Sequence, residues 1–446
     1  MGTDAYHSIR FDGNLCNGCV ACMRVCPTQA IRVRHQRAVM LEDRCIDCCE
    51  CLKACKRSAI IPLTESPSTL PDFEYSVAVP SPALYTQYDR DVTPGVILQA
   101  LRESGFDDAA TLSWACEAVT RAIEYYLDAY RGPFPLISSF CPSVVRLVQV
   151  KYPDLLGQLL PVLSPREVAA REAKRRKSEE LAVGMDQVGT VYLTPCPAKM
   201  VSIADHPGME RSYINSAVAI SDIFPLLAPV IREIQTTRAR VDQRETAAGL
   251  GWAFSIGLPS SLPAEDTLSV WGLPNVLRTL DDIEKGRLGR YAFIECHACP
   301  EGCVSGALTV ENPYVARARA IRLQQSLPRR ALIDEADVRE RFARHEFHTP
   351  VPFKARPSSP LDRDIERAIV KMKQRDHLAA DLPGIDCGAC GAPTCAAFAE
   401  DVVTGAAEQA DCVFVRVARI QDAVQELVAL VRHSDKGAGP TREGRL

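Results

Sequence analysis

The chain has 446 residues, of which 47% are hydrophobic and 24% are charged, and its formal net charge is -4. This composition excludes a disordered or collagen-like chain and gives no reason to expect a nucleic-acid partner. No apolar run approaches the roughly 18 residues of a membrane helix, and the N-terminus lacks the basic head and apolar segment of a secretion signal. We therefore expect roughly two to four domains in a cytoplasmic protein without a membrane span.

Nineteen cysteines are the main signal in this sequence. Cytoplasmic thiols are kept reduced, so ligation of metals or clusters is favoured over disulfides. Eight of the cysteines form two copies of the pattern C-x2-C-x2-C-x3-C near the N-terminus. The copies consist of Cys16, Cys19, Cys22 and Cys26 and of Cys45, Cys48, Cys51 and Cys55.

This spacing is typical of ferredoxins with two 4Fe-4S clusters, in which the fourth cysteine of each run ligates the other cluster. We expect one cluster on Cys16, Cys19, Cys22 and Cys55 and the other on Cys45, Cys48, Cys51 and Cys26. Tetrahedral zinc is the alternative, but zinc sites usually pair two short knuckles across a longer gap. Cys49 interrupts the spacing and is interpreted as a small hydrophobic bystander.

The middle of the chain alternates short apolar runs with amphipathic stretches, which favours a layered α/β body. We predict strands at residues 76–79, 136–139, 188–193 and 291–294 and helices at residues 96–101, 111–130 and 165–181. Ser164, Pro165 and Glu167 form the cap, first-turn proline and capping-box acid that open the last of these helices.

Three of the predicted strands end at cysteines, and strand ends are where ligands gather in open α/β sheets. The segments are Phe140-Cys141-Pro142, Pro195-Cys196-Pro197-Ala198-Lys199 and Glu295-Cys296-His297-Ala298-Cys299-Pro300-Glu301-Gly302-Cys303. Together with Ser164-Pro165 they resemble the signature loops of the [FeFe] hydrogenase large subunit, over roughly residues 76–323. The resemblance implies a cubane on Cys141, Cys196, Cys299 and Cys303.

In that family the counterpart of Cys303 also bridges to a diiron subsite with carbonyl, cyanide and dithiolate ligands, and the counterpart of Lys199 hydrogen-bonds cyanide. Four departures concern this subsite. Phe140 replaces the cysteine that relays protons, His297 replaces a methionine, and Ser202 replaces a glutamate. Gly306-Ala307-Leu308 also replaces a triple glycine. The resemblance therefore implies an intact cubane site with a degraded apparatus for turning over dihydrogen. Cys303, Lys199 and His297 are the candidate catalytic residues.

A further motif, C-x2-C-x4-C-x16-C, stands near the C-terminus as Cys387, Cys390, Cys395 and Cys412. Residues 396–410 are compatible with a helix that returns the chain to deliver the fourth ligand. The motif resembles the single-cubane domain of anaerobic electron-transfer proteins, with zinc again as the alternative. A last helix over residues 413–432 carries an apolar stripe, which we expect to pack in a local core and not to dock a partner.

The fold prediction is a two-lobed, hydrogenase-like α/β body with an α+β bacterial ferredoxin domain and a small, mostly helical 4Fe-4S domain. The expected boundaries are residues 1–64, 76–348 and 364–432, followed by a polar tail at 433–446. Linkers rich in proline and serine are expected at residues 65–74 and 349–361. The chain resembles a sensory-type branch of the hydrogenase family, without the signalling domain that relatives append.

Four 4Fe-4S clusters on one chain predict a subunit of a soluble, anaerobic redox complex that carries single electrons. Expected partners are a flavoprotein, other iron-sulfur subunits or a ferredoxin, with no dihydrogen turnover by the chain itself. The alternative is a slow hydrogenase or dihydrogen sensor that retains the diiron subsite. A cluster-assembly factor is a third hypothesis, which the ferredoxin and C-terminal motifs make less natural.

Overall fold

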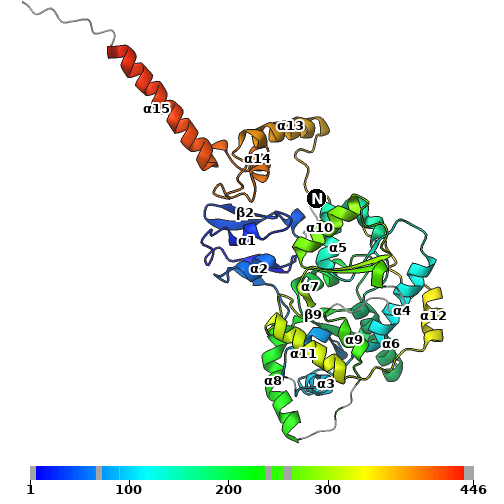
Figure 1. Cartoon of the computed structure of the whole chain (residues 1–446). Coiled ribbons are helices and arrows are strands. Elements are labelled where there is room, and N and C mark those ends of the chain that lie inside the picture. Colours follow the sequence, from blue (N-terminus) through cyan, green and yellow to red (C-terminus); the bar gives the residue numbers. More distant parts are fainter. Residues whose placement is uncertain are drawn as a thin grey trace, which may run out of the picture. The chain divides into compact units, whose positions relative to one another are not determined.

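The computed structural model describes residues 7–66, 73–89, 91–237, 241, 244–254 and 264–435 (Figure 1). Most of the predicted linker at 65–74 and most of the polar tail lie outside the described residues. The chain forms two compact units. The first contains Met1–Asp12 and Glu42–Ser358, and the second contains Gly13–Leu41 and Ser359–Leu446.

Two parallel sheets form the body of the first unit. One has the strand order β6 (Asp108–Ala109), β5 (Tyr75–Pro80), β8 (Val188–Thr194) and β9 (Ser216–Ala219), and the other has the order β10 (Thr267–Trp271), β11 (Phe293–His297) and β7 (Leu136–Ile137). The predicted strands are confirmed as β5, β7, β8 and β11. The two sheets also confirm a two-lobed α/β body, because parallel strands need helical crossovers.

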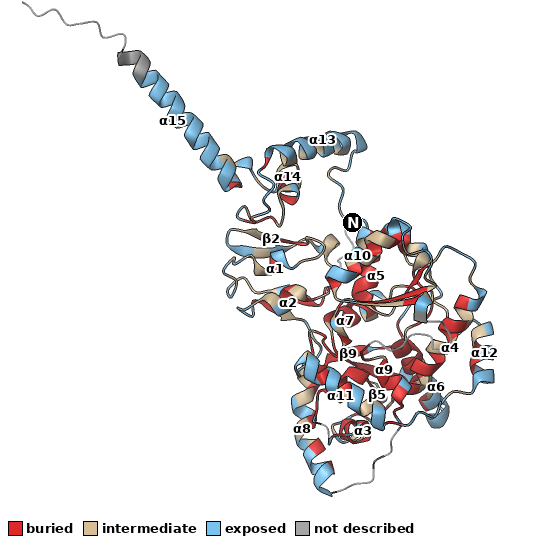
Figure 2. Ribbon diagram, viewed as in Figure 1, coloured by how far each residue is buried: buried red, intermediate tan, exposed pale blue. Residues whose placement is uncertain are grey.

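Helices cover these sheets, and their inward faces are buried (Figure 2). They are α3 (Pro94–Glu103), α4 (Ser113–Ala129), α5 (Pro142–Lys151), α6 (Pro165–Leu181), α7 (Pro197–Asp205), α8 (Ile220–Thr237), α9 (Ala247–Gly251), α10 (Leu273–Glu284), α11 (Pro313–Ser326) and α12 (Glu335–Ala343). Strand β8 is buried at all of its residues, as expected for a central parallel strand covered on both faces. The short strand β12 (Pro300–Cys303) follows β11.

Helix α6 begins where the sequence predicts, but its capping box is absent. The Ser164 side chain makes no capping hydrogen bond, and the Glu167 carboxylate instead accepts hydrogen bonds from the Ser212 hydroxyl (2.9 Å) and the Tyr213 amide (2.9 Å). A buried carboxylate needs strong donors, and the loop before β9 supplies them. Proline at the first helical position still sets the start, because its missing N–H has no acceptor in a first turn.

The ferredoxin region is divided between the two units. In the first unit, β1 (Ile9–Phe11) pairs antiparallel with β4 (Ile60–Pro62), and α2 (Glu50–Ala54) lies between them in sequence. In the second unit, α1 (Ala21–Arg24) precedes the hairpin of β2 (Ile31–Arg34) and β3 (Arg37–Met40). Each cysteine run is therefore described within its own unit.

The C-terminal part of the second unit is helical, with α13 (Ile365–Asp381), α14 (Cys395–Val403) and α15 (Val413–Asp435). Its small core includes Leu382, Phe398 and Cys412. Helix α14 is shorter than predicted, because it ends before Gly405, whose φ of +81° favours glycine. The prediction of a local core beneath the last apolar stripe is wrong: Val417 is 47% exposed and Leu427 is 61% exposed (Figure 2).

Candidate metal centre

Four cysteines of the first unit converge where the two parallel sheets end. Cys141 follows β7 and caps α5, and Cys196 follows β8 and caps α7, each with a proline at the first helical position. Cys299 and Cys303 flank the turn from β11 into β12. Helix N-termini carry partial positive charge, so both capping positions favour thiolates.

The electrostatics of this group fit a cationic cluster. Burial, together with the neighbouring thiols Cys196, Cys141 and Cys303, raises the pKa of Cys299 to about 12 against the lowering effect of Lys53. Four half-buried thiolates repel one another, and a metal cluster supplies the missing positive charge. Soft sulfur ligands suit iron-sulfur clusters. This donor set therefore fits the cubane that the sequence predicts here.

The Lys199 side chain lies beside the sulfur of Cys303 and stabilises its negative charge. Its Nζ lies 3.2 Å from Cys303 Sγ. Burial lowers the pKa of Lys199, but the nearby thiols, Cys303 foremost, raise it well above its usual value. Burial likewise opposes ionisation of Cys303, and Lys199 and His297 outweigh this effect and lower the pKa of its thiol. The lysine therefore stays protonated, and the facing sulfur of Cys303 ionises more readily than those of Cys141 and Cys299, whose pKa values are raised.

A cavity of about 60 Å³ adjoins Cys303 and Lys199. A space of this size holds about two waters at the roughly 30 Å³ that each occupies in the liquid. Phe140 and Trp252 line it and meet edge to face, with ring centroids 5.0 Å apart. Phe140 thus directs an aromatic ring, and no ionisable group, toward the space beside Cys303.

Polar groups line the rest of this cavity. His297 Nε2 lies 2.9 Å from Glu295 Oε1. Burial lowers the pKa of His297, but the Glu295 charge and hydrogen bond raise it overall. Arg166 donates to the Ser202 hydroxyl (2.7 Å), while its Nε and Nη1 atoms and Ser164 Oγ are buried without a hydrogen bond to the residues described. Arg166, Trp252 and Glu295 were not predicted from the sequence, although Arg166 directly follows Ser164-Pro165.

The second ferredoxin run adjoins this site within the first unit. Lys53 Nζ, on α2, lies 4.0 Å from Cys299 Sγ. Cys49 is fully buried, and burial together with nearby Cys51, Cys48 and, more weakly, Cys196 raises the pKa of its thiol. Cys48 of this run packs against the same hydrophobic cluster as Cys141 of the body site, whereas Cys49 belongs to neither predicted ligand set.

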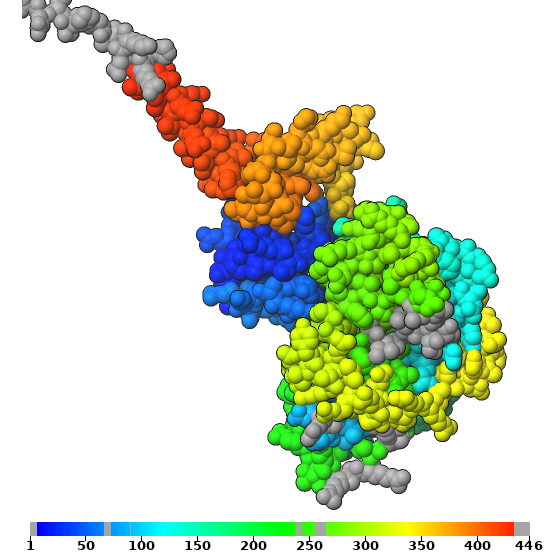
Figure 3. Space-filling model, viewed as in Figure 1, coloured from blue at the N-terminus to red at the C-terminus, as the bar shows by residue number. Residues whose placement is uncertain are grey.

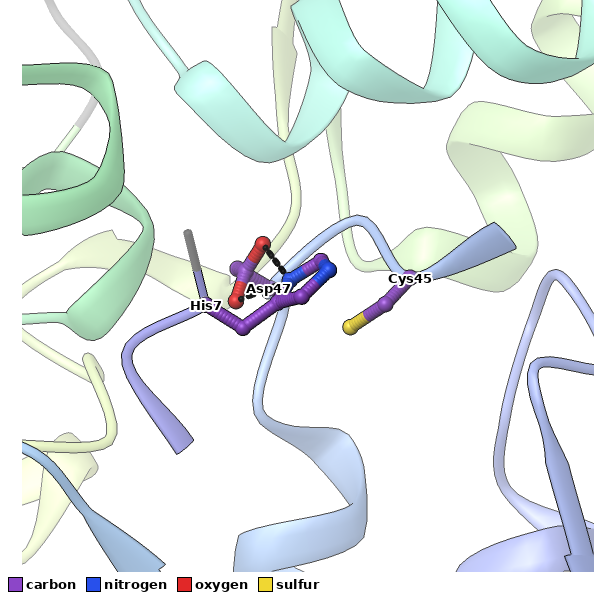
Figure 4. A group of neighbouring side chains, drawn as sticks. All are labelled: His7, Cys45 and Asp47. Atoms are coloured by element: carbon purple, nitrogen blue, oxygen red, sulfur yellow. Dashed lines mark hydrogen bonds and ion pairs between the residues drawn. The ribbon is translucent and has the colours of Figure 1, made fainter. Parts of the chain in front are cut away.

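His7, Cys45 and Asp47 also form a group close enough to bind a metal (Figure 4). His7 Nδ1 lies 2.9 Å from Asp47 Oδ2, and its Nε2 lies 3.1 Å from the Glu42 carbonyl oxygen. Arg146, on α5, also donates to Asp47. Because both ring nitrogens and the carboxylate already have protein partners, this group fits an anchor for the ligand loop better than a separate metal site.

Backbone amides point at sulfurs in both ferredoxin runs. The Ala30 amide donates to Cys26 Sγ (3.2 Å), and the Ala59 amide donates to Cys55 Sγ (3.3 Å). Such hydrogen bonds are typical of iron-sulfur ligands and tune their potentials. This geometry fits the predicted cubane ligands.

The C-terminal cysteines gather around a small core in the second unit. Burial raises the pKa of Cys390, and the neighbouring Cys412 and Cys387 raise it further. Cys395 begins α14, and its amide donates to the Asp386 carboxylate (2.7 Å). Cys412, Cys390 and Cys395 pack in the same small core, which fits a shared cluster site.

Comparison with protein families decides the relationship. A model described as the iron only hydrogenase large subunit, C-terminal domain, matches residues 74–251 and 262–307, which is half of the chain. The chain belongs to this hydrogenase family. A 4Fe-4S dicluster domain matches residues 8–56, and an Fe-S cluster domain matches residues 382–414. This chain is thus an iron-sulfur protein with a ferredoxin-type N-terminal region.

Individual relatives show how far this hydrogenase-like chain has diverged. It is 24% identical over 402 residues to the periplasmic [Fe] hydrogenase large subunit of Nitratidesulfovibrio vulgaris, covering 75% of this chain and 94% of the relative. It is 29% identical over 166 residues to iron hydrogenase 1 of Clostridium pasteurianum, covering 36% of this chain and 28% of the relative. The NADP-reducing hydrogenase subunit HndD of Solidesulfovibrio fructosivorans is 24% identical over 180 residues, or 36% of this chain and 31% of that subunit.

Solved structures of the [FeFe] hydrogenase HydA1 from Chlamydomonas reinhardtii are also similar. The apo form of one variant has a TM-score of 0.48 and 16% identity, covering 64% of this chain and 95% of that chain. A second variant has the same score and identity, with coverages of 65% and 97%. Among the helices in the described residues of the hydrogenase-like chain, none combines the length and apolar character needed to cross a bilayer.

Proposed function

We propose that this chain is an electron-transfer subunit of a redox complex, with 4Fe-4S clusters at all four predicted sites and no dihydrogen turnover of its own. The observation that carries the proposal is the contact between two ligand sets in the first unit. Lys53 Nζ of the second ferredoxin run lies 4.0 Å from Cys299 Sγ, and Cys48 of that run packs against the same hydrophobic cluster as Cys141. Single electrons could then pass between adjoining clusters without moving a domain.

Phe140 supports the second half of the proposal. General acid-base catalysis needs an ionisable group within hydrogen-bond reach of the reacting atom. The ring at this position packs on Trp252 and offers neither donor nor acceptor to the cavity beside Cys303. Proton supply through this position is therefore absent, and the chain's residues are left with the task of holding clusters and setting their charge.

The relatives support membership of a complex. One of them is named as a subunit of an NADP-reducing hydrogenase. For this chain we propose a flavoprotein, another iron-sulfur subunit or a ferredoxin as partner, because a carrier of single electrons needs both a donor and an acceptor. A cytoplasmic location remains part of this proposal.

A second candidate function follows from the cavity. Lys199 and Cys303, whose counterparts in the family serve the diiron subsite, lie beside each other at this cavity, and Arg166 adds unsatisfied donors. A chain that loads this subsite would be a slow hydrogenase or a dihydrogen sensor. In that case Lys199 and Arg166 would hold its anionic ligands, and His297 with Glu295 would hold a proton nearby.

Infrared spectroscopy with iron counting separates the two candidates. The protein is purified without oxygen from its native host, where any maturation system is present. About 16 irons per chain with no carbonyl or cyanide bands supports the electron-transfer subunit. Carbonyl and cyanide bands would contradict it and establish the second candidate. Phe140→Cys is the matched variant: it should leave the iron count unchanged and yield no dihydrogen oxidation if the diiron subsite is absent.

A further inference from the structure

The hairpin of the first ferredoxin run binds the C-terminal cluster domain within the second unit. Arg32 Nε and Arg34 Nη2, both on β2, bind one carboxylate, that of Asp401 on α14. Arg32 and Asp401 are only 4% and 6% exposed. Between the two arginines, the Val33 amide donates to the Gly391 carbonyl oxygen (2.8 Å). Residues 32–34 therefore form a continuous contact with the C-terminal domain.

Two glycines allow this contact to be close. Gly391 has a φ of +79°, and a Cβ atom there would lie 1.9 Å from the Val33 carbonyl oxygen. A Cβ atom at Gly388 would lie 3.0 Å from Met23 Cε, also with a positive φ of +74°. Both glycines belong to the ligand loop that begins at Cys387. That loop therefore packs directly on the backbone of β2 and on α1.

The ligand loops themselves touch. Arg24 lies between Cys22 and Cys26 in the first ferredoxin run, and its Nη2 donates to the Cys387 carbonyl oxygen (3.1 Å). Arg34 Nη1 donates to the Cys390 carbonyl oxygen (3.0 Å). Space-filling surfaces of the two segments, dark blue and orange, also meet in Figure 3.

We propose that Arg32, Arg34 and Asp401 are positioning residues that hold the C-terminal cluster site in direct electronic contact with the first ferredoxin run. The C-terminal site is thus a terminal of the electron path, and it exchanges electrons through the ferredoxin. In each exchange one cubane is oxidised by one electron and the other is reduced by one, with no proton transferred. The inference rests on the proposed function for its use, but the contact can be tested without it.

Electron paramagnetic resonance of the fully reduced, full-length protein tests the electronic contact. Two nearby paramagnetic clusters broaden and split each other's signals. Asp401→Asn should remove the part of this interaction that involves the C-terminal cluster while leaving the iron count unchanged. Asp422→Asn removes the same charge from an exposed position on α15 and should change nothing. Interaction that persists unchanged in Asp401→Asn would overturn the proposal.

Asp401→Asn lies in the C-terminal domain and would give no spin interaction if it lost the cluster there. Arg34→Gln is therefore the second variant, because Arg34 lies on β2, outside that domain. Hydrogen exchange of the Val33 amide is a second readout, expected to accelerate about 100-fold or more when a buried ion pair is broken. Unchanged exchange and unchanged spin interaction in Arg34→Gln would overturn the proposal. Diiron bands in the infrared would instead contradict only the proposed function, because the spin interaction would remain.

Helix α15 carries an exposed apolar stripe that is independent of the contact between β2 and the C-terminal domain. Its apolar residues follow heptad spacing, with Val417, Val424 and Val431 at the a positions and Val413, Ile420 and Leu427 at the d positions. Those at 413–427 are between 39% and 61% exposed. The helix is pale blue over most of its length in Figure 2 and is the red segment in Figure 3. An alternation of three and four residues is the spacing of a coiled-coil seam.

We infer that a second copy of this chain covers the stripe in a parallel, two-stranded coiled coil. Valine at all three a positions, with leucine at the d position Leu427, favours this state. Charges also permit self-association. Arg416 is the only charged residue at the e and g positions from Phe414 to Leu430, and in a parallel pair it faces Gln421. Two identical chains therefore meet without like charges opposed across the seam.

Sedimentation equilibrium of the full chain tests this surface. We expect twice the chain mass of 48.9 kDa. Val424→Glu places a charge in the seam and should give a monomer, whereas Gln425→Glu adds the same charge at the next position, outside the seam, and should leave the dimer intact. A monomeric wild type, or a dimer that survives Val424→Glu, would overturn the inference. A larger oligomer would contradict the two-stranded state.

Discussion

The two ferredoxin runs have the same local backbone but different neighbours. Left-handed residues recur at matching positions, with φ of 58° at Val20 and 61° at Cys49, and 53° at Gln29 and 51° at Ser58. The amide-to-sulfur hydrogen bonds of the last cysteines recur as well. The ligand spacing therefore determines the local fold of each run, whichever unit contains it.

The positions between the ligands determine what each run contacts. Arg24 and Lys53 both stand two residues before the last cysteine, yet Arg24 binds the Cys387 carbonyl and Lys53 approaches Cys299 Sγ. Asp47 binds Arg146 of the body, whereas at the matching Gly18 a Cβ atom would lie 2.8 Å from the Gln36 backbone. One repeated motif thus serves two neighbouring cluster sites through its variable residues.

Removing one of the body cysteines should have the largest effect, because it should abolish a whole cluster and leave both ferredoxin runs loaded. Cys303→Ser should lower the iron content by about four atoms per chain and abolish one set of cubane signals. Both ferredoxin runs should keep their clusters, because their ligands are separate. Iron analysis and electron paramagnetic resonance measure this. Unchanged spectra would show that no cubane forms on the body cysteines.

The anchor of the second run should be the next most sensitive point. Arg146→Met leaves the buried Asp47 carboxylate without its arginine and should lower the free energy of unfolding by about 3 to 5 kcal/mol. Anaerobic denaturant unfolding measures this. The control is Arg211→Gln, since the ion pair of Arg211 with Asp186 leaves both side chains mostly exposed (77% and 80%) and its loss should cost below about 1 kcal/mol. Equal losses in the two variants would contradict the anchor.

Lys53 and Arg24 should each affect the reduction potential of a different cluster, because Lys53 approaches Cys299 and Arg24 binds the Cys387 carbonyl. Burial lowers the pKa of Lys53, but Cys299 and Glu50 raise it overall, so the side chain stays charged. Lys53→Gln should lower the potential of the body cluster by tens of millivolts, on the order expected for loss of one partly screened charge. Arg24→Gln should act on the C-terminal cluster instead. Redox titrations decide, and equal shifts at both clusters would contradict the division.

Replacing Cys49 should have the smallest effect on stability and iron content. Cys49→Val copies the residue found at the matching Val20, and a hydrophobic exchange of similar size should cost below about 1.5 kcal/mol. The iron content should not change, because burial raises the pKa of this thiol and keeps it protonated. A loss of iron in this variant would make Cys49 a ligand.

Much of the body was predictable because its signals are local. Strands β5 and β8 are apolar runs, α4 and α6 have helical spacing, and the cysteines follow strand ends. The stripe on α15 was misassigned to a local core because helical spacing of apolar residues predicts an apolar face, but does not say which part of the protein or which partner would cover it. The Ser164 cap failed because Glu167 found stronger donors in a distant loop.

The sequence by itself determined the ligand runs, the family and the α/β class, since these depend on residue spacing and on short-range backbone preferences. Only the tertiary structure decided which neighbour each ferredoxin run serves, that Phe140 packs on Trp252 beside Cys303, and that Arg166 lines the same cavity. Contacts between residues hundreds of positions apart, such as Arg32 with Asp401, leave no periodic trace in the sequence. They depend on how separately specified elements pack, because burial and ion pairing act through space.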